Sequence, residues 1–289
     1  MWTLIYLNRR LKPDRHGRDK DPRFHPFICE ASASWSYLMT PFTHFFFLPR
    51  YVGLYVCAFT CLFLTKMIVL GQDINKPVGP TRRWLVIKVT AFLMRIFLLL
   101  YGICRWKARR ASKVDYSKWL GPDWKPKYDG AGMFVSNHSF FPDAFLLFIF
   151  ADPMPGFVAK EGVKVIPAVG FIASAVQSIF MHRQTADKND KKRLMQQILE
   201  RQEQAEKGEM PPLLIYPEGC TTNGKYIIKF KKGAFAALKP VKPIVFNYSG
   251  LRCSPCMGDP LNVWHYSVIL FQCVLVQAEL IEMPVFEPN

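Results

Sequence analysis

The clearest structural signal in the chain is MFVSNHSFFPDAFLLFIF, residues 133–150, in which a polar turn separates two apolar runs. The first run, residues 133–135, is typical of a short buried strand. Because the residue before a proline avoids the helical region, a helix is predicted to begin at Pro142 and to extend to Phe150. His138 then belongs to the turn between the strand and the helix.

This turn can bring the imidazole of His138 against the carboxylate of Asp143. An aspartate bonded to one imidazole nitrogen fixes the tautomer, and the other nitrogen can then remove a proton from a hydroxyl. The neighbouring Ser139 is not in a G-x-S-x-G elbow, so the substrate would have to supply the attacking oxygen. The alternative interpretation is structural: a histidine that caps a turn, and an aspartate that favours the helix dipole.

Beyond this motif, strands and helices alternate, which indicates an α/β domain with helices packed on a largely parallel sheet. Further strands are predicted at residues 157–159, 178–181, 212–216, 243–248 and 279–285, and a long charged helix at 189–207. Residues 263–276 are apolar throughout and fit either a buried helix or a pair of strands.

Polar residues follow three of these strands. Arg183 and Lys160 end two of them, where a cationic side chain can hold a phosphate. The strand that ends at Tyr216 is followed by Pro-Glu-Gly, in which Glu218 can bind a substrate hydroxyl and backbone donors near Gly219 can approach an oxyanion. The alternatives are surface charges for the two cations and a simple chain reversal for the loop.

Two apolar stretches precede this domain, joined by a connector rich in proline and glycine. The first, residues 42–70, contains an uncharged run at 51–65 that is shorter than the ~20 residues of a spanning helix. The second, residues 84–106, is interrupted by three basic residues. Together they predict a membrane-associated helical hairpin at 42–110, which either spans the bilayer or lies in one leaflet. Two core helices of a soluble domain are the alternative.

The remaining parts are a basic, irregular arm at residues 1–41 and the α/β domain at 111–289. The formal net charge of +16 suits an anionic membrane surface, anionic substrates or nucleic acid. The basic residues form no recognisable nucleic-acid-binding module, and the apolar hairpin favours lipid, so no nucleic-acid partner is expected. The N-terminus has no secretory signal, but its arginines leave a mitochondrial address open.

The eight cysteines are scattered and form no disulfide framework. Cys253 and Cys256 make one C-x-x-C motif, without the second pair of ligands that a structural zinc site requires. We therefore expect free thiols and no metal.

Taken together, the motifs resemble those of the glycerolipid acyltransferase superfamily, which includes glycerol-3-phosphate, lysophosphatidate and lysophosphatidylcholine acyltransferases. N-H-x-x-x-x-D occurs at residues 137–143, a basic strand end at Arg183, Y-P-E-G-C at 216–220 and V-K-P-I-V at 241–245. The pattern is most similar to the lysophosphatidylcholine and lysophosphatidylethanolamine acyltransferases, which share the F-K-x-G-A-F motif that follows and an N-terminal pair of apolar segments. Four ordered motifs at fitting intervals are more specific than any one of them.

The resemblance implies a glycerol-3-phosphate-acyltransferase-like fold and transfer of an acyl group from acyl-CoA to the hydroxyl of a lysophospholipid or related glycerophosphate. It assigns His138 as general base, oriented by Asp143, with Arg183, Lys160, Glu218 and Gly219 binding substrate. Gly219 and Cys220 then form the oxyanion loop. It further implies acyl-CoA as co-substrate, no cofactor, and membrane lipids as partners. The expected location is the endoplasmic reticulum membrane, with the mitochondrial inner membrane as the alternative.

Cys220 departs from the pattern, because the superfamily usually has threonine at this position. A thiol donates a weaker hydrogen bond than a hydroxyl. This departure and the basic arm motivate a second hypothesis, in which the chain is a catalytically weakened or inactive structural subunit of a larger membrane complex. Product formation by the purified protein would argue against that hypothesis.

Overall fold

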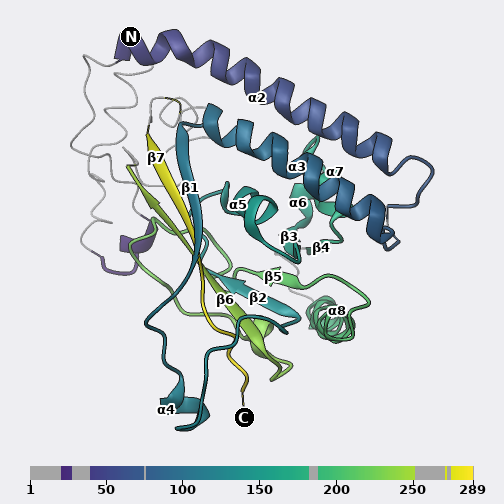
Figure 1. The fold of residues 1–289 in the computed structure, drawn as a ribbon, viewed down its shortest axis with the longest axis vertical. Coiled ribbons are helices and arrows are strands. Elements are labelled where there is room, and N and C mark those ends of the chain that lie inside the picture. Colours follow the sequence, from purple (N-terminus) through teal and green to yellow (C-terminus); the bar gives the residue numbers. More distant parts are fainter. Residues whose placement is uncertain are drawn as a thin grey trace.

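A seven-stranded sheet lies at the centre of the computed structural model, which describes residues 21–27, 40–74, 76–181, 188–250, 271 and 275–288 (Figure 1). The strand order is β1-β7-β6-β2-β5-β3-β4. The strands are β1 (Ile103–Arg110), β2 (Met133–Ser136), β3 (Gly156–Lys160), β4 (Ile179–Met181), β5 (Leu213–Ile215), β6 (Val241–Ser249) and β7 (Val276–Glu282). All neighbouring strands are parallel except β6 and β7, which are antiparallel.

Helices cover both faces of this sheet (Figure 1). They are α2 (Thr40–Ile68), α3 (Pro80–Leu100), α4 (Ser117–Leu120), α5 (Asp143–Phe150), α6 (Glu161–Lys164), α7 (Val169–Ala175) and α8 (Lys188–Glu206), with the 3-10 turns η2 (His25–Phe27) and η4 (Lys232–Phe235). Met133 in β2 packs in one cluster with Ile198 of α8, whereas the next residue, Phe134, packs in a second cluster with α3 and α5. This alternation is expected of a strand that is buried on both faces.

The predicted α/β fold with a mostly parallel sheet is confirmed. Each predicted strand and the long charged helix occur, with ends that differ by one to three residues. The predictions for Arg183, for the Cys253–Cys256 pair and for most of residues 263–276 concern positions outside the described residues. Of the predicted arm, only residues 21–27 and the first residues of α2 are described.

The second apolar stretch does not stay helical to residue 106. Helix α3 ends at Leu100, and Gly102 takes a φ of +78°, a left-handed conformation that favours glycine. The chain then enters β1, which pairs in parallel with β7. Residues 103–110, which the apolar pattern placed in the hairpin, therefore form an edge strand of the sheet. The pattern was misleading because a short apolar run fits a strand as well as a helix end.

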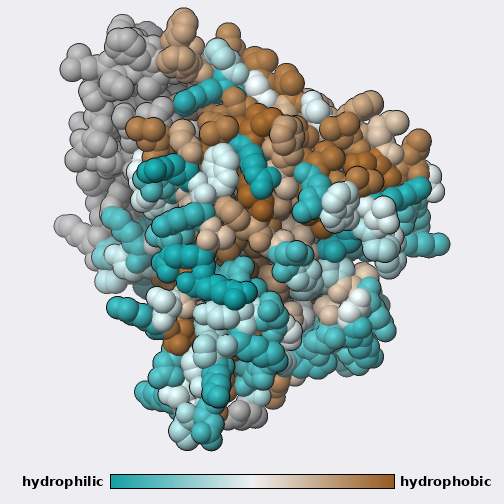
Figure 2. Space-filling model, viewed as in Figure 1, coloured by the Kyte–Doolittle hydropathy of each residue, from teal (hydrophilic) through white to brown (hydrophobic). Residues whose placement is uncertain are grey.

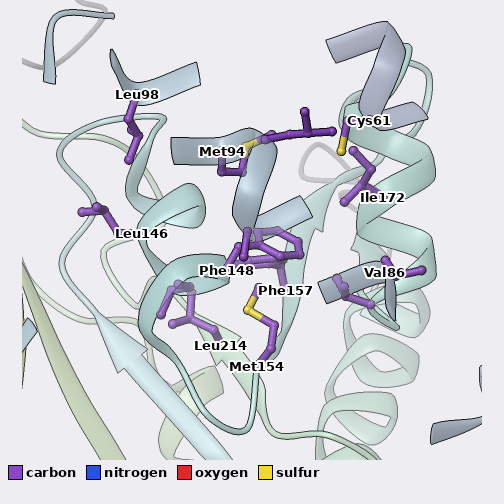
Figure 3. Close-up of a cluster of buried hydrophobic side chains, with 14 of the residues drawn as sticks. Cys61, Val86, Met94, Leu98, Leu146, Phe148, Met154, Phe157, Ile172 and Leu214 are labelled. Carbon is purple, nitrogen blue, oxygen red and sulfur yellow. The ribbon is translucent and has the colours of Figure 1, made fainter. Parts of the chain in front are cut away.

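Helices α2 and α3 share a core with the α/β domain. Figure 3 shows Cys61 of α2 and Met94 of α3 in the same cluster as Phe148 of α5 and Leu214 of β5. All four side chains are buried. The inner face of the hairpin is therefore packed on the α/β domain, and its position relative to the sheet is held by apolar burial.

The outer face of α2 is apolar but is not buried. A single helical stripe carries Val52, Val56, Phe59, Phe63 and Met67, each more than half exposed. Figure 2 shows this hydrophobic surface as a brown band over α2 and α3. Residues 45–68 form a 24-residue segment with a mean hydropathy of 1.7, and among the described helices only α2 is long and apolar enough to cross a membrane. We call the five residues above the apolar stripe.

Candidate active site

The turn between β2 and α5 brings His138 and Asp143 together. Nδ1 of His138 lies 3.0 Å from Oδ2 of Asp143. The Asp143 side chain is fully buried, whereas the His138 side chain keeps 23% of its surface exposed. Within the described part of the chain, Nε2 of His138 makes no hydrogen bond. The imidazole can therefore meet a ligand from outside while its inner nitrogen is held by the aspartate.

Asp143 is held by more donors than the histidine alone. Its Oδ2 also accepts the backbone N–H groups of Ser139, at 3.2 Å, and Phe140, at 3.1 Å. Its Oδ1 accepts the hydroxyl of Tyr248 at 2.5 Å. Both oxygens of this buried carboxylate are thus satisfied, and its orientation is fixed by groups on α5's own turn and on β6.

The asparagine before His138 fastens the turn to the sheet. The side chain of Asn137 accepts the backbone N–H of Phe246 at 2.8 Å and donates to the carbonyl oxygen of the same residue at 3.0 Å. On the other side, the carbonyl oxygen of His138 accepts the backbone N–H of Thr222 at 2.9 Å. The turn is therefore bonded to β6 and to the loop that follows β5.

The ring of Tyr216, at the end of β5, covers one face of the His138 imidazole. The two rings are stacked, with centroids 3.9 Å apart and planes 17° apart. The Tyr216 hydroxyl is buried, and no described residue bonds to it. Burial, and then the negative charge of Asp143, raises the pKa of Tyr216 well above its ordinary value, so the phenol stays neutral.

Tyr216→Phe is expected to stabilise the protein, because it removes a buried hydroxyl that makes no hydrogen bond and keeps the stacked ring. An unsatisfied buried polar group costs about 1–3 kcal/mol, so the melting temperature should rise by roughly 2–5 °C. The matched control is Tyr128→Phe, which removes a hydroxyl that donates to the Ala111 carbonyl at 2.9 Å and should lower the melting temperature. Thermal unfolding of both variants decides the question, and a Tyr216→Phe protein that melts below wild type would contradict it.

Glu218 supports the backbone of this site. It is 2% exposed, and its two carboxylate oxygens accept the backbone N–H groups of His138 and Ile228, each at 3.2 Å. Burial raises the pKa of Glu218 above its usual value, and the two backbone donors oppose that rise. In this structure Glu218 joins the loop after β5 to His138, and its predicted bond to a substrate hydroxyl stays a prediction.

Gly219 occupies a position that only glycine fits. Its φ is +73°, and a Cβ atom there would lie 2.5 Å from Nζ of Lys231, whose side chain passes over it. The Gly219 N–H donates to the Tyr216 carbonyl oxygen at 2.9 Å. Among the described residues, none accepts the N–H of Cys220 or of Thr221. The donors that this loop leaves for an oxyanion are therefore those after Gly219, including that of Cys220.

Cations line the same edge of the sheet. Lys160 ends β3, which is separated from β2 by β5 alone, so the strand spacing of ~4.8 Å places both strand ends at one edge. Its side chain is exposed. Lys231 adds a second cation above Gly219. Arg183, the third predicted cation, lies outside the described residues.

Part of the predicted N-terminal arm contacts this site. Asn223 donates from its side chain to the carbonyl oxygen of His25 at 2.7 Å, and from its backbone to that of Pro26 at 2.8 Å. Asn223 follows Thr222, which bonds to His138. Residues 21–27 therefore brace the loop that supports the catalytic turn.

The sequence interpretation missed Tyr248, treated Tyr216 as a mild change, and named Lys231 only as added positive charge. Tyr248 could have been suspected, because it lies on the strand predicted at 243–248, and an aromatic hydroxyl near a strand end can reach a neighbouring motif. Lys231 could not have been placed, because its contact with Gly219 depends on how the loop after β5 folds.

Comparisons with known proteins agree with the motifs. Residues 121–247 match the Acyltransferase family. The lysophospholipid acyltransferase LPEAT1 of Arabidopsis thaliana is 30% identical over 220 residues, which cover 72% of this chain and 54% of that protein. The human lysophosphatidylcholine acyltransferase 2 is 29% identical over 226 residues, 75% of this chain and 37% of that protein. The chain thus spans about half, or less, of the length of these relatives.

A solved structure supports the fold. The 1-acyl-sn-glycerophosphate (LPA) acyltransferase PlsC from Thermotoga maritima superposes with a TM-score of 0.53 and 14% identity. The match covers 86% of this chain and 88% of that chain, so it includes the helices outside the family match as well as the sheet. The predicted membership of the glycerolipid acyltransferase superfamily and the predicted fold class are confirmed.

Proposed function

Because this chain belongs to the acyltransferase family, with its family domain at residues 121–247, we propose that it transfers a fatty acyl group from acyl-CoA to the free hydroxyl of a lysophospholipid. The observation that carries this proposal is the His138–Asp143 pair, in which a buried carboxylate holds an exposed imidazole at 3.0 Å. A base of this kind, without a neighbouring protein nucleophile, suits direct attack by a substrate hydroxyl.

The reaction follows from the roles of these groups. The lysolipid phosphate binds at the basic edge, where Lys160 and Arg183 supply the charge. Nε2 of His138 removes the proton of the lipid hydroxyl while that oxygen attacks the thioester carbonyl carbon. The new C–O bond forms, the C–S bond breaks, and the imidazolium returns the proton to the coenzyme A sulfur. Asp143 stabilises the imidazolium in between. No further cofactor enters this scheme.

The oxyanion is assigned to the backbone rather than to a side chain. The N–H groups of Cys220 and Thr221 point to no acceptor among the described residues, whereas that of Gly219 is engaged with Tyr216. Backbone donors do not depend on the side chain at position 220. The thiol of Cys220 lies 3.8 Å from the carbonyl oxygen of Glu218, a contact that leaves the loop unchanged. We therefore favour the enzyme over the inactive structural subunit, which Cys220 first suggested.

A lipid-product assay with purified protein tests the proposal. Lysophosphatidylethanolamine, lysophosphatidylcholine, lysophosphatidate and glycerol 3-phosphate are each offered with acyl-CoA donors of several chain lengths, and the products are identified by mass spectrometry. We expect an acylated product from at least one lysophospholipid and no product when acyl-CoA is omitted. Failure with every acceptor, combined with stable co-purification of other subunits, would favour the structural-subunit hypothesis.

The apolar stripe is proposed to bind the membrane from which the lipid substrate comes. Burying large apolar side chains is favourable by about 1.5–3 kcal/mol each, so five of them on one face suffice for stable attachment. Since α2 and α3 share their core with α5, attachment would place the catalytic turn at a fixed distance from the bilayer. Of the two host membranes, we propose the endoplasmic reticulum, with the mitochondrial inner membrane as the alternative.

Phe63→Glu is expected to weaken membrane binding, because Phe63 is 63% exposed on the apolar stripe. An acidic side chain in the bilayer core costs about 2.5–3.5 kcal/mol, so the vesicle-bound fraction should fall by a partition factor of roughly 100. Leu238→Glu is the matched control, because Leu238 is 77% exposed but lies outside the hairpin. Flotation with phospholipid vesicles measures both, and equal binding of the two variants would rule out the apolar stripe as the membrane face.

A further inference from the structure

Tyr248 makes the shortest hydrogen bond to the catalytic pair. Its hydroxyl donates to Oδ1 of Asp143 at 2.5 Å, whereas His138 bonds to the other oxygen, Oδ2, at 3.0 Å. We propose that Tyr248 is a positioning residue that holds the Asp143 carboxylate in the orientation that His138 requires. The inference rests on the proposed function, since it concerns the same base.

The two carboxylate oxygens are held in unequal ways. Oδ2 accepts two backbone N–H groups besides the imidazole, from Ser139 and Phe140. Within the described residues, Oδ1 has Tyr248 as its hydrogen-bond donor and no other. Asp143 is fully buried, so solvent cannot replace that donor. Without the hydroxyl, the carboxylate keeps its backbone anchor at Oδ2 but carries a buried oxygen with no donor, and it becomes free to rotate about that anchor.

The ring of Tyr248 is itself held in place. It lies on β6, which pairs in parallel with β2, the strand that leads into the catalytic turn. The reciprocal bonds between Asn137 and Phe246 fix the register two residues away. The Tyr248 ring also meets the buried Phe140 ring edge to face, with centroids 5.2 Å apart. The hydroxyl is therefore delivered to Asp143 by a rigid strand rather than by a mobile loop.

This geometry separates positioning from substrate binding. Tyr248 contacts Asp143 on the oxygen that does not face His138, so its effect on the reacting hydroxyl passes through the carboxylate. Asn137 and Tyr248 together make β6 a third support of the N-H-x-x-x-x-D motif, besides the turn and α5. The motif alone does not contain this support, because β6 lies about a hundred residues later in the chain, at Val241–Ser249.

Steady-state kinetics of Tyr248→Phe, alone and combined with Asp143→Asn, test the inference. In the otherwise wild-type protein, kcat should fall roughly ten- to hundredfold with the KM values unchanged, as for a lost hydrogen bond to a charged group. In the Asp143→Asn background, where no carboxylate charge remains, the further loss should be under about twofold. Tyr128→Phe, which removes a hydroxyl bonded to Ala111 away from the site, is the control and should retain wild-type kcat. Equal losses in both backgrounds would overturn the inference.

A second measurement needs no turnover. Diethyl pyrocarbonate modifies neutral imidazole, and mass spectrometry of the His138 peptide gives the rate as a function of pH. In Tyr248→Phe the midpoint should rise by about 0.5–1 pH unit, because the carboxylate that has lost a donor holds the imidazolium more strongly. The same midpoint in Tyr248→Phe and Tyr128→Phe would refute the positioning role. If wild type forms no lipid product but the midpoint still moves, the proposed function fails and the role of Tyr248 stands.

Discussion

Replacing His138 with alanine is expected to lower the rate of phospholipid formation by about 10²–10⁴-fold while the protein stays folded. The loss is large because Nε2 is the group that removes the proton, and no other described base lies on the catalytic turn. Folding should survive, because the side chain is partly exposed and the turn remains bonded through Asn137 and Thr222.

His138→Gln separates chemistry from structure. The amide can still donate toward Asp143, but it has no basic nitrogen, so it should be as inactive as the alanine variant. Initial rates of lipid product, measured with matched melting temperatures, give the comparison. More than about a tenth of the wild-type rate in either variant would be incompatible with a general base at this position.

Asp143→Asn should also lower kcat by about 10²–10⁴-fold, without unfolding the protein. Asparagine has nearly the same size, its amide oxygen can accept the N–H groups of Ser139 and Phe140, and its amide can donate to the Tyr248 oxygen. What it lacks is the negative charge that stabilises the imidazolium. Kinetics and circular dichroism on the same preparation measure both properties.

Asp143→Ala provides the contrast in stability. It leaves the donors of Ser139, Phe140 and Tyr248 buried without an acceptor, which should cost about 3 kcal/mol or more. The melting temperature should then fall by roughly 6–12 °C, against little change for asparagine. If the alanine variant melted with the asparagine variant, the hydrogen bonds to this carboxylate would not be structural, and its assignment as the fixed partner of His138 would be wrong.

The central motif was predictable because its geometry is set locally. Pro142 determines where α5 begins, and that start determines that His138 lies in a turn within reach of Asp143. The parallel strands were predictable for the same reason, since short apolar runs bounded by turns keep their type in most contexts. The edge strand β1 was not, because residues 103–110 become a strand only by pairing with β7, which lies far along the chain.

The supports of the site depend on contacts between distant segments. Tyr248 reaches Asp143 across 105 positions, and Glu218 reaches the backbone of His138 across 80. A motif gives the type of such a residue but not the group that its side chain meets. Glu218 illustrates this, because an acidic residue in a substrate-facing motif is here bonded through both oxygens to backbone donors.

The membrane hairpin and the active site are one structural unit. Met94 and Leu98 of α3 lie in the same cluster as Leu146 of α5, the helix that begins with Asp143 (Figure 3). The exposed apolar stripe on α2 is on the far side of that packing from the core. An enzyme that takes its acceptor from a bilayer needs such a fixed relation between the lipid surface and the base, which a soluble acceptor would not require.

The most direct test is to incubate purified wild-type and His138→Ala proteins with lysophospholipid in vesicles and acyl-CoA carrying a ¹³C-labelled acyl chain. We predict that wild type forms labelled diacyl phospholipid with one free coenzyme A thiol per product, and that the variant forms neither above background. Labelled phospholipid at the same rate from both proteins, or from neither, would contradict catalysis by the His138–Asp143 pair.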